Sequence, residues 1–164
     1  MPKTLRLLLA ISAVAAALAG AAGALACGNT SGYSYAGLSA PSHAYGISAI
    51  VSPLDAFDIF NGHVAGWVGV GGPGEGPNGS NEWLQVGYAG FPGVTGSDIY
   101  YEVALPGRFP TYHQVSSDMP VGTVAKVAVL EMHNRPNWWR VWLNHKPVSQ
   151  PIRLPESDAR WTPK

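Results

Sequence analysis

Glycine and proline interrupt the chain at short intervals from residue 53 onward, and this spacing restricts the fold more than any other feature of the sequence. With 20 Gly and 14 Pro in 164 residues, few segments are long enough for a helix. The interruptions are Pro53, Asn61-Gly62, the glycine-rich segment 71–81, Pro92-Gly93, Pro106-Gly107, Pro120 with Gly122, and Asn144 with Pro147. Such residues form turns because they adopt backbone conformations that strands and helices exclude.

The runs between these turns are rich in Val, Ile, Tyr and Trp, which is typical of strands. They predict strands at 45–51, 64–70, 82–89, 98–105, 123–132, 137–143 and 148–153. No window of helical period occurs after the N-terminal segment. The sequence therefore predicts an all-β fold, an antiparallel sandwich or barrel.

The N-terminal segment has the features of a secretory signal peptide. Lys3 and Arg6 precede an apolar run from Leu7, and Ala24-Leu25-Ala26 provides a small-x-small cleavage site before Cys27. We predict that residues 1–26 are a signal peptide and that the protein is secreted. Two alternatives are a membrane anchor formed by the same run and a lipid attached to Cys27.

The remaining 138 residues suffice for one domain. Residues 27–43 predict a Gly/Ser/Tyr-rich lead-in, and residues 44–164 predict the β-sandwich domain. Without Lys3 and Arg6 the chain has 8 basic and 10 acidic residues and no basic run, so nucleic acid is not an expected partner. Cys27 is the single cysteine, so the chain cannot form an internal disulfide. After removal of the signal we expect a monomer without membrane attachment.

Several motifs are more consistent with ordinary structure than with a site. Gly74, Gly76 and Gly79 match G-x-G-x-x-G, but Pro77 lies inside the motif and strand residues follow it, whereas a dinucleotide site needs a helix there. We predict a hairpin loop. The five histidines are scattered without metal-ligand spacing, and neither Ser80 nor Ser97 lies in a nucleophile motif. We therefore expect no cofactor and no metal.

The stretch EWLQVGYAG, residues 82–90, places an amide in an otherwise apolar strand. Strict alternation puts Trp83, Gln85 and Gly87 on one face and Leu84 with Val86 on the other. Gln85 is therefore either a packed polar group or part of a site.

Three further predicted strands carry side chains that are likewise either structural or part of a site. In NWWRVWLN, residues 137–144, Trp138 and Trp142 flank Arg140 on one face, and Trp139 lies on the other; core packing is the favoured interpretation, and a stacking platform is the alternative. Glu102 and Glu131 each interrupt an apolar strand, where a carboxylate faces either solvent or a site.

Taken in order, AGWVGVGG at 65–72, EWLQVG at 82–87, YYEV at 100–103 and MPVGTVAKVAVLEM at 119–132 resemble the glutamic peptidases, or eqolisins. The resemblance extends from Ala44 to Ile152, and its most specific part is L-Q-x-G at Leu84–Gly87. It implies a concanavalin-like (jelly-roll type) sandwich and a secreted acid endopeptidase. Gln85 matches the family's catalytic glutamine.

The resemblance also implies a substrate groove that includes Trp67, Trp83 and Glu102. Glu102 matches a glutamate of the family that is not the catalytic one, and Gly71 stands where the family has an aspartate. No A-E-x motif supplies the catalytic glutamate, so we expect that the chain lacks the last strands of such a sandwich.

These features favour a secreted glutamic-peptidase-like protein, an acid endopeptidase of polypeptides by resemblance, that lacks the catalytic glutamate in the given sequence. If that sequence is complete, we expect no peptidase activity. One alternative is a concanavalin-like module that binds glycan or peptide through Trp67, Trp83 and either Trp138 or Trp142. The other is a sandwich in which Gln85 is simply a buried hydrogen-bonding residue.

Overall fold

The computed structural model describes residues 24–30, 33–40, 44–53 and 58–157, and these residues form strands with no α-helix among them. The chain divides into two compact units, residues 1–40 and residues 41–164. The predicted signal peptide falls largely on residues 1–23, which lie outside the described part. No helix in the described part is long and apolar enough to cross a membrane.

In the first unit, β1 (Ala24–Thr30) and β2 (Tyr33–Ser39) form an antiparallel two-stranded sheet. Cys27 pairs with Ala36 in its register. The sequence predicted a lead-in, either ordered or flexible, and no strands here, because Gly, Ser and Tyr occur without an apolar period. Backbone pairing forms these strands without requiring such a period.

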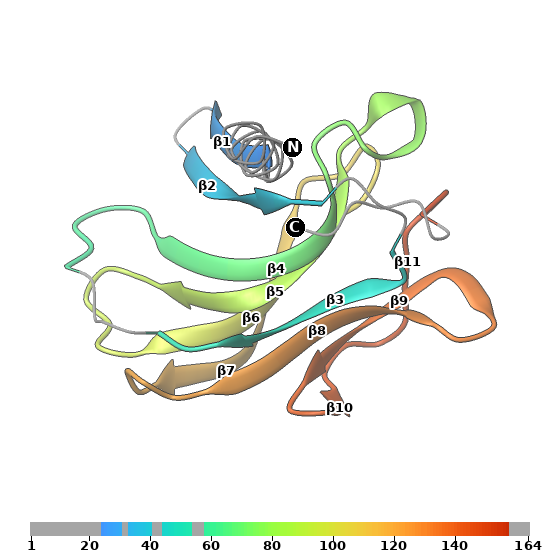
Figure 1. Ribbon diagram of the computed structural model, residues 1–164. Coiled ribbons are helices and arrows are strands. Elements are labelled where there is room, and N and C mark those ends of the chain that lie inside the picture. The colour runs from blue at the N-terminus through green and yellow to red at the C-terminus, as the bar shows by residue number, and fades with distance from the viewer. Residues whose placement is uncertain (1–23, 31–32, 41–43, 54–57, 158–164) are drawn as a thin grey trace, which may run out of the picture. The chain divides into compact units, whose positions relative to one another are not determined.

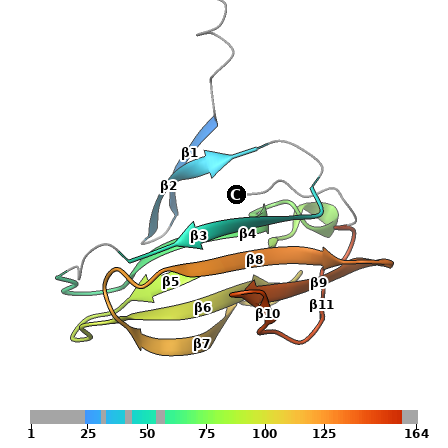
Figure 2. The same cartoon turned by 60° about the horizontal axis from the view of Figure 1, so that its bottom comes forward.

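The second unit contains two antiparallel sheets that face each other as a β-sandwich (Figure 1). One sheet has the order β4-β5-β6-β7; its strands are β4 (Val64–Gly72), β5 (Glu82–Gly90), β6 (Ser97–Ala104) and β7 (Thr111–Met119). The other has the order β10-β9-β8-β3, with β11 also paired to β9; its strands are β3 (Gly46–Val51), β8 (Ala125–Met132), β9 (Arg135–Leu143), β10 (Lys146–Pro147) and β11 (Ile152–Arg153). Figure 2 shows β8 and β9 lying over β5 and β6.

The core lies between these two sheets. Its buried side chains are Val70, Leu84 and Val86 from one sheet, Val127, Val129, Trp139 and Val141 from the other, and Leu154. Each strand contributes alternate residues, because successive side chains of a strand point to opposite faces. Trp139 is therefore a core residue. Trp138 and Trp142, for which core packing was the favoured interpretation, lie on the other face of β9 and are not part of this cluster.

The segment after β9 closes one end of this core. Leu154 and Ser157 are fully buried, and the Trp139 Nε1–H donates to the Ser157 hydroxyl at 2.7 Å. That hydroxyl donates in turn to the Leu154 carbonyl at 2.6 Å. The sequence predicted only a connecting loop from Leu154 onward. The hydrogen bond that holds this segment joins Ser157 to a tryptophan 18 residues away in the chain, so local sequence could not predict it.

Six of the seven predicted strands are confirmed within a few residues at their ends, and one is wrong. The strand predicted at 148–153 is limited to Ile152–Arg153, because Pro151 cannot donate to a ladder and the Ser149 hydroxyl instead accepts the Val141 N–H at 3.0 Å. The prediction missed β7, whose sequence TYHQVSSDM is mostly polar. This strand lies at an edge of its sheet, where little burial is required of it.

The loop between β4 and β5 has the predicted hairpin character. It contains a single 3-10 turn, η1 (Pro77–Gly79), and returns the chain antiparallel to β4. Asn78 and Gly79 have φ angles of 56° and 74°, conformations that favour asparagine and glycine.

Candidate functional site

Gln85 and Glu102 lie directly opposite each other on adjacent strands. The register of β5 and β6 pairs them, and the registers of the neighbouring strands add Gly69 on one side and Tyr112 on the other. Leu84 and Val86 occupy the core face, so Gln85 and Glu102 face away from the core. We call this surface, with Trp67, Trp83, Gln85, Tyr100, Glu102 and Tyr112, the Gln85 face.

Three hydrogen bonds connect Gln85 and Glu102 to each other and to two aromatic neighbours. The Trp83 indole N–H donates to Glu102 Oε1 at 2.9 Å, and the Gln85 amide Nε2 lies 3.5 Å from the same oxygen. Gln85 Nε2 also donates to the Tyr100 hydroxyl at 3.3 Å. Among the described residues no hydrogen bond reaches Glu102 Oε2. The second carboxylate oxygen is therefore open to a donor from outside this group.

Glycines give the Gln85 side chain its space. A Cβ added at Gly69 would lie 2.8 Å from Gln85 Cβ and 2.7 Å from the Leu84 carbonyl oxygen. At Gly87 an added Cβ would lie 2.0 Å from the Gly66 carbonyl oxygen. Because real Cβ atoms do not approach backbone this closely, glycine is required at both positions.

Aromatic side chains form the β7 side of the face. Tyr100 and Tyr112 stack with ring centroids 4.9 Å apart and an interplanar angle of 14°, and Phe91 meets the Tyr112 ring edge-on at 6.0 Å. The Tyr112 hydroxyl donates to Asp98 at 3.2 Å. Burial, followed by the charge and hydrogen bond of Asp98, raises the pKa of Tyr112, so this phenol stays a neutral donor.

The structure thus brings Trp83 and Gln85 to the same carboxylate oxygen of Glu102. Trp67 pairs with Gly87 on β5, two residues along that strand from Gln85. In the described part of the chain no hydrogen bond or ring contact links Trp67 to Gln85. Sequence reasoning missed Tyr100 and Tyr112. The alternation of YYEV placed Tyr100 on the face of Glu102, but Tyr112 belongs to the unpredicted strand β7.

The other tryptophans lie elsewhere. Trp138 and Trp142 are on β9, in the opposite sheet, and they face away from the core because Trp139 between them faces into it. The combined groove that the sequence suggested, with Trp67 and Trp83 beside Trp138 or Trp142, is therefore wrong. Trp138 instead lies beneath the Arg135 guanidinium, which is 4.8 Å from the centroid of its ring.

A second carboxyl group that the sequence did not single out is buried at the start of β5. Glu82 is 0% exposed, and neither of its oxygens has a hydrogen-bond partner in the described structure. The Ser80 hydroxyl beside the same loop is also buried without a partner there. Burial, followed by the charge of Glu156, raises the pKa of Glu82 to about 7. This carboxyl therefore holds its proton under acidic conditions.

The described residues contain no group of three or more His, Cys, Asp or Glu side chains arranged to hold a metal ion. Two of the histidines contact aromatic rings: His113 stacks on Tyr101 at 4.5 Å, and His63 lies 5.8 Å from Phe91. His43 lies outside the described residues.

No protein-family model, curated protein or solved structure matches the chain.

Proposed function

We propose that this protein is a secreted, glutamic-peptidase-like sandwich of the concanavalin type that binds an extended polypeptide on its Gln85 face. The observation that carries the proposal is the contact of Gln85 with Glu102, both of which also contact an aromatic neighbour. An amide and a carboxylate together offer acceptors to peptide N–H groups and a donor to peptide carbonyls. The aromatic rings beside them offer apolar contacts to side chains.

Hydrolysis is the chemical step that this pair supports. Glu102 takes a proton from a water molecule as that water attacks the peptide carbonyl carbon, and the Gln85 amide, which cannot ionise, donates to the oxyanion that forms. Glu102 then returns the proton to the peptide nitrogen as the C–N bond breaks, which releases a carboxylic acid and an amine. The two hydrogen bonds of Gln85 Nε2 are long, at 3.3 and 3.5 Å, so a stronger acceptor can replace them. On this proposal Glu102 is the base, although the family resemblance does not assign it that role.

The test uses the secreted chain with a reduced and alkylated protein as substrate, between pH 3 and pH 7. We expect binding in this range that Gln85→Ala and Glu102→Gln both weaken, and cleavage that both variants abolish. Gln150→Ala is the matched control, because Gln150 is exposed and remote in sequence from this face. Binding without cleavage would reduce the proposal to a peptide-binding module. A protein that neither binds nor cleaves the substrate would overturn the proposal.

The stacked Tyr100–Tyr112 pair favours a second candidate, a module that binds glycan. Sugar rings stack on flat aromatic surfaces, and carboxylate and amide groups bind their hydroxyls. Titration with a set of soluble polysaccharides, followed by tryptophan fluorescence, separates the two. A response to glycan but not to denatured protein would favour this candidate.

A further inference from the structure

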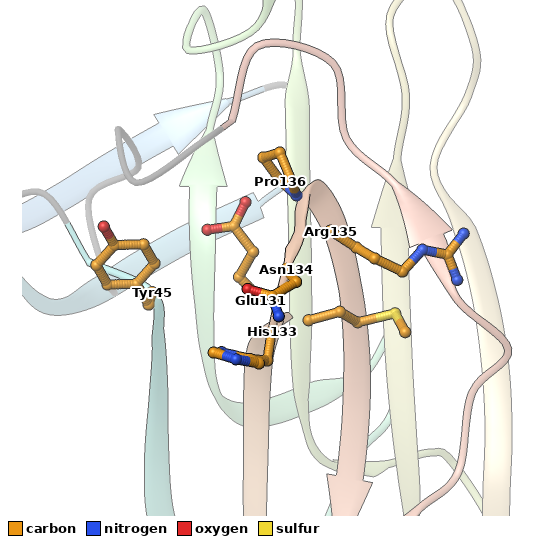
Figure 3. A pocket seen from close by; sticks show the side chains of 7 residues that line it. Tyr45, Glu131, His133, Asn134, Arg135 and Pro136 are labelled. Atoms are coloured by element: carbon orange, nitrogen blue, oxygen red, sulfur yellow. The ribbon is translucent and has the colours of Figure 1, made fainter.

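A pocket of about 410 Å³ lies at the turn between β8 and β9, in the sheet opposite to the Gln85 face. Its walls are Tyr45 and the hairpin residues Glu131, Met132, His133, Asn134, Arg135 and Pro136 (Figure 3). This volume falls within the range of about 300–1,000 Å³ that small-molecule sites occupy. The proposed function does not use any of these residues.

Glu131 is held in a fixed position at this pocket. Its backbone N–H donates to the Tyr45 carbonyl at 2.8 Å, and its Oε1 accepts the Asn137 N–H at 2.6 Å. Its Oε2 is buried and has no hydrogen-bond partner in the described part of the protein. A buried carboxylate oxygen without a donor is costly, so a ligand that supplies one gains the corresponding free energy.

The neighbouring cations do not neutralise this carboxylate. The Arg135 guanidinium lies over the Trp138 ring, and Figure 3 shows its side chain extending away from Glu131. His133 is exposed, and within the described residues no ion pair joins it to Glu131. The pocket therefore contains an oriented negative charge whose natural partner is a cation with N–H donors.

We propose that this pocket binds a primary ammonium group. The ammonium donates to Glu131 Oε2 and lies against the Tyr45 ring, which is 70% exposed and attracts cations through its face. Oε2 is buried, so an ammonium reaches it only when neighbouring side chains move, a common adjustment on binding. The shared chemistry is an alkylammonium, supplied either by a lysine side chain or by the α-amino group of a chain.

The test is a titration of the full secreted chain at pH 8 with n-butylammonium and its uncharged analogue n-butanol. Amide NMR shifts report binding. We expect shifts at Asn137 and at 131–135 with the ammonium only, and binding that is about tenfold weaker or more in Glu131→Gln. Glutamine keeps an oxygen for the Asn137 N–H, so this variant removes the charge with little change of shape. The exposed Asp58→Asn serves as the charge-matched control and should bind as the parent does.

Two outcomes would overturn the proposal: equal shifts with n-butanol, or unchanged ammonium binding in a folded Glu131→Gln protein. If that variant does not fold, Tyr45→Leu at the exposed wall replaces it, and undiminished binding there has the same meaning. Parallel titrations with Nα-acetyl-lysine amide and alanine amide identify the source. Binding of only the first indicates a lysine side chain, and binding of only the second indicates an α-amino group. A failure of both would contradict the proposal, whatever the result at the Gln85 face.

Discussion

The Glu102 carboxylate accepts the Trp83 indole N–H at 2.9 Å through the same oxygen that lies 3.5 Å from the Gln85 amide. Trp83 is therefore a positioning residue for the acceptor on this face. We expect Trp83→Phe to lower the free energy of unfolding by about 0.5–1.5 kcal/mol through the lost hydrogen bond, together with a weaker response to denatured protein. Urea unfolding and binding titrations measure the two effects. If Trp83→Phe binds denatured protein as well as the parent does, Trp83 does not position Glu102 for binding.

Glu82 makes stability depend on pH with a definite sign. Its folded-state pKa of about 7 lies above the ordinary value of 4.5, so the native state holds the proton more tightly than the unfolded state. The native state is therefore not penalised below pH 4.5, and it loses stability as the pH rises from 4.5 to about 7. The total loss is about 3 kcal/mol if the group behaves independently.

Glu82→Gln should remove this dependence. We expect the variant to unfold at similar urea concentrations at pH 5 and pH 8, whereas the parent protein is less stable at pH 8. Glu75→Gln controls for the loss of a negative charge near the same loop. An unchanged pH dependence in Glu82→Gln would show that other groups cause it.

The Trp139–Ser157 hydrogen bond connects the end of the chain's described part to the core. Ser157→Ala leaves the buried indole N–H without its acceptor, and we expect a loss of about 1–3 kcal/mol in the free energy of unfolding. Ser157→Thr keeps a hydroxyl and separates this loss from a change in packing. Chemical denaturation followed by tryptophan fluorescence is the measurement. Equal stability of Ser157→Ala and the parent would show that the indole finds another partner.

At Gly87 the backbone of the neighbouring strand β4 lies too close for a Cβ atom. We expect Gly87→Ala to cost about 1–3 kcal/mol, since its Cβ would collide with the Gly66 carbonyl. Gly37→Ala is the control, because a Cβ there meets no atom within 4 Å. Thermal unfolding distinguishes the two. A harmless Gly87→Ala would mean that β4 and β5 shift apart easily.

The strands that follow a clear apolar alternation could be predicted from the sequence, and so could the face on which each residue lies. Leu84 and Val86 faced the core, Trp139 joined them, and Gln85 shared a face with Trp83, because side chains of a strand alternate with period two. Strand β7 was missed because its edge position requires few apolar residues. The β1–β2 pair and the two-residue strand β10 were missed because backbone pairing, not side-chain pattern, defines them.

The sequence did not show which residues surround Gln85. Register decided that Gln85 lies opposite Glu102 rather than two residues away, because alternation along a strand determines only the face on which a residue lies. The same holds for the burial of Glu82 and for the separation of Trp83 from Trp138 onto different sheets. The sequence by itself determined which residues point inward and which outward along each strand. Only the tertiary structure decided which outward residues meet, because that requires the pairing of distant segments.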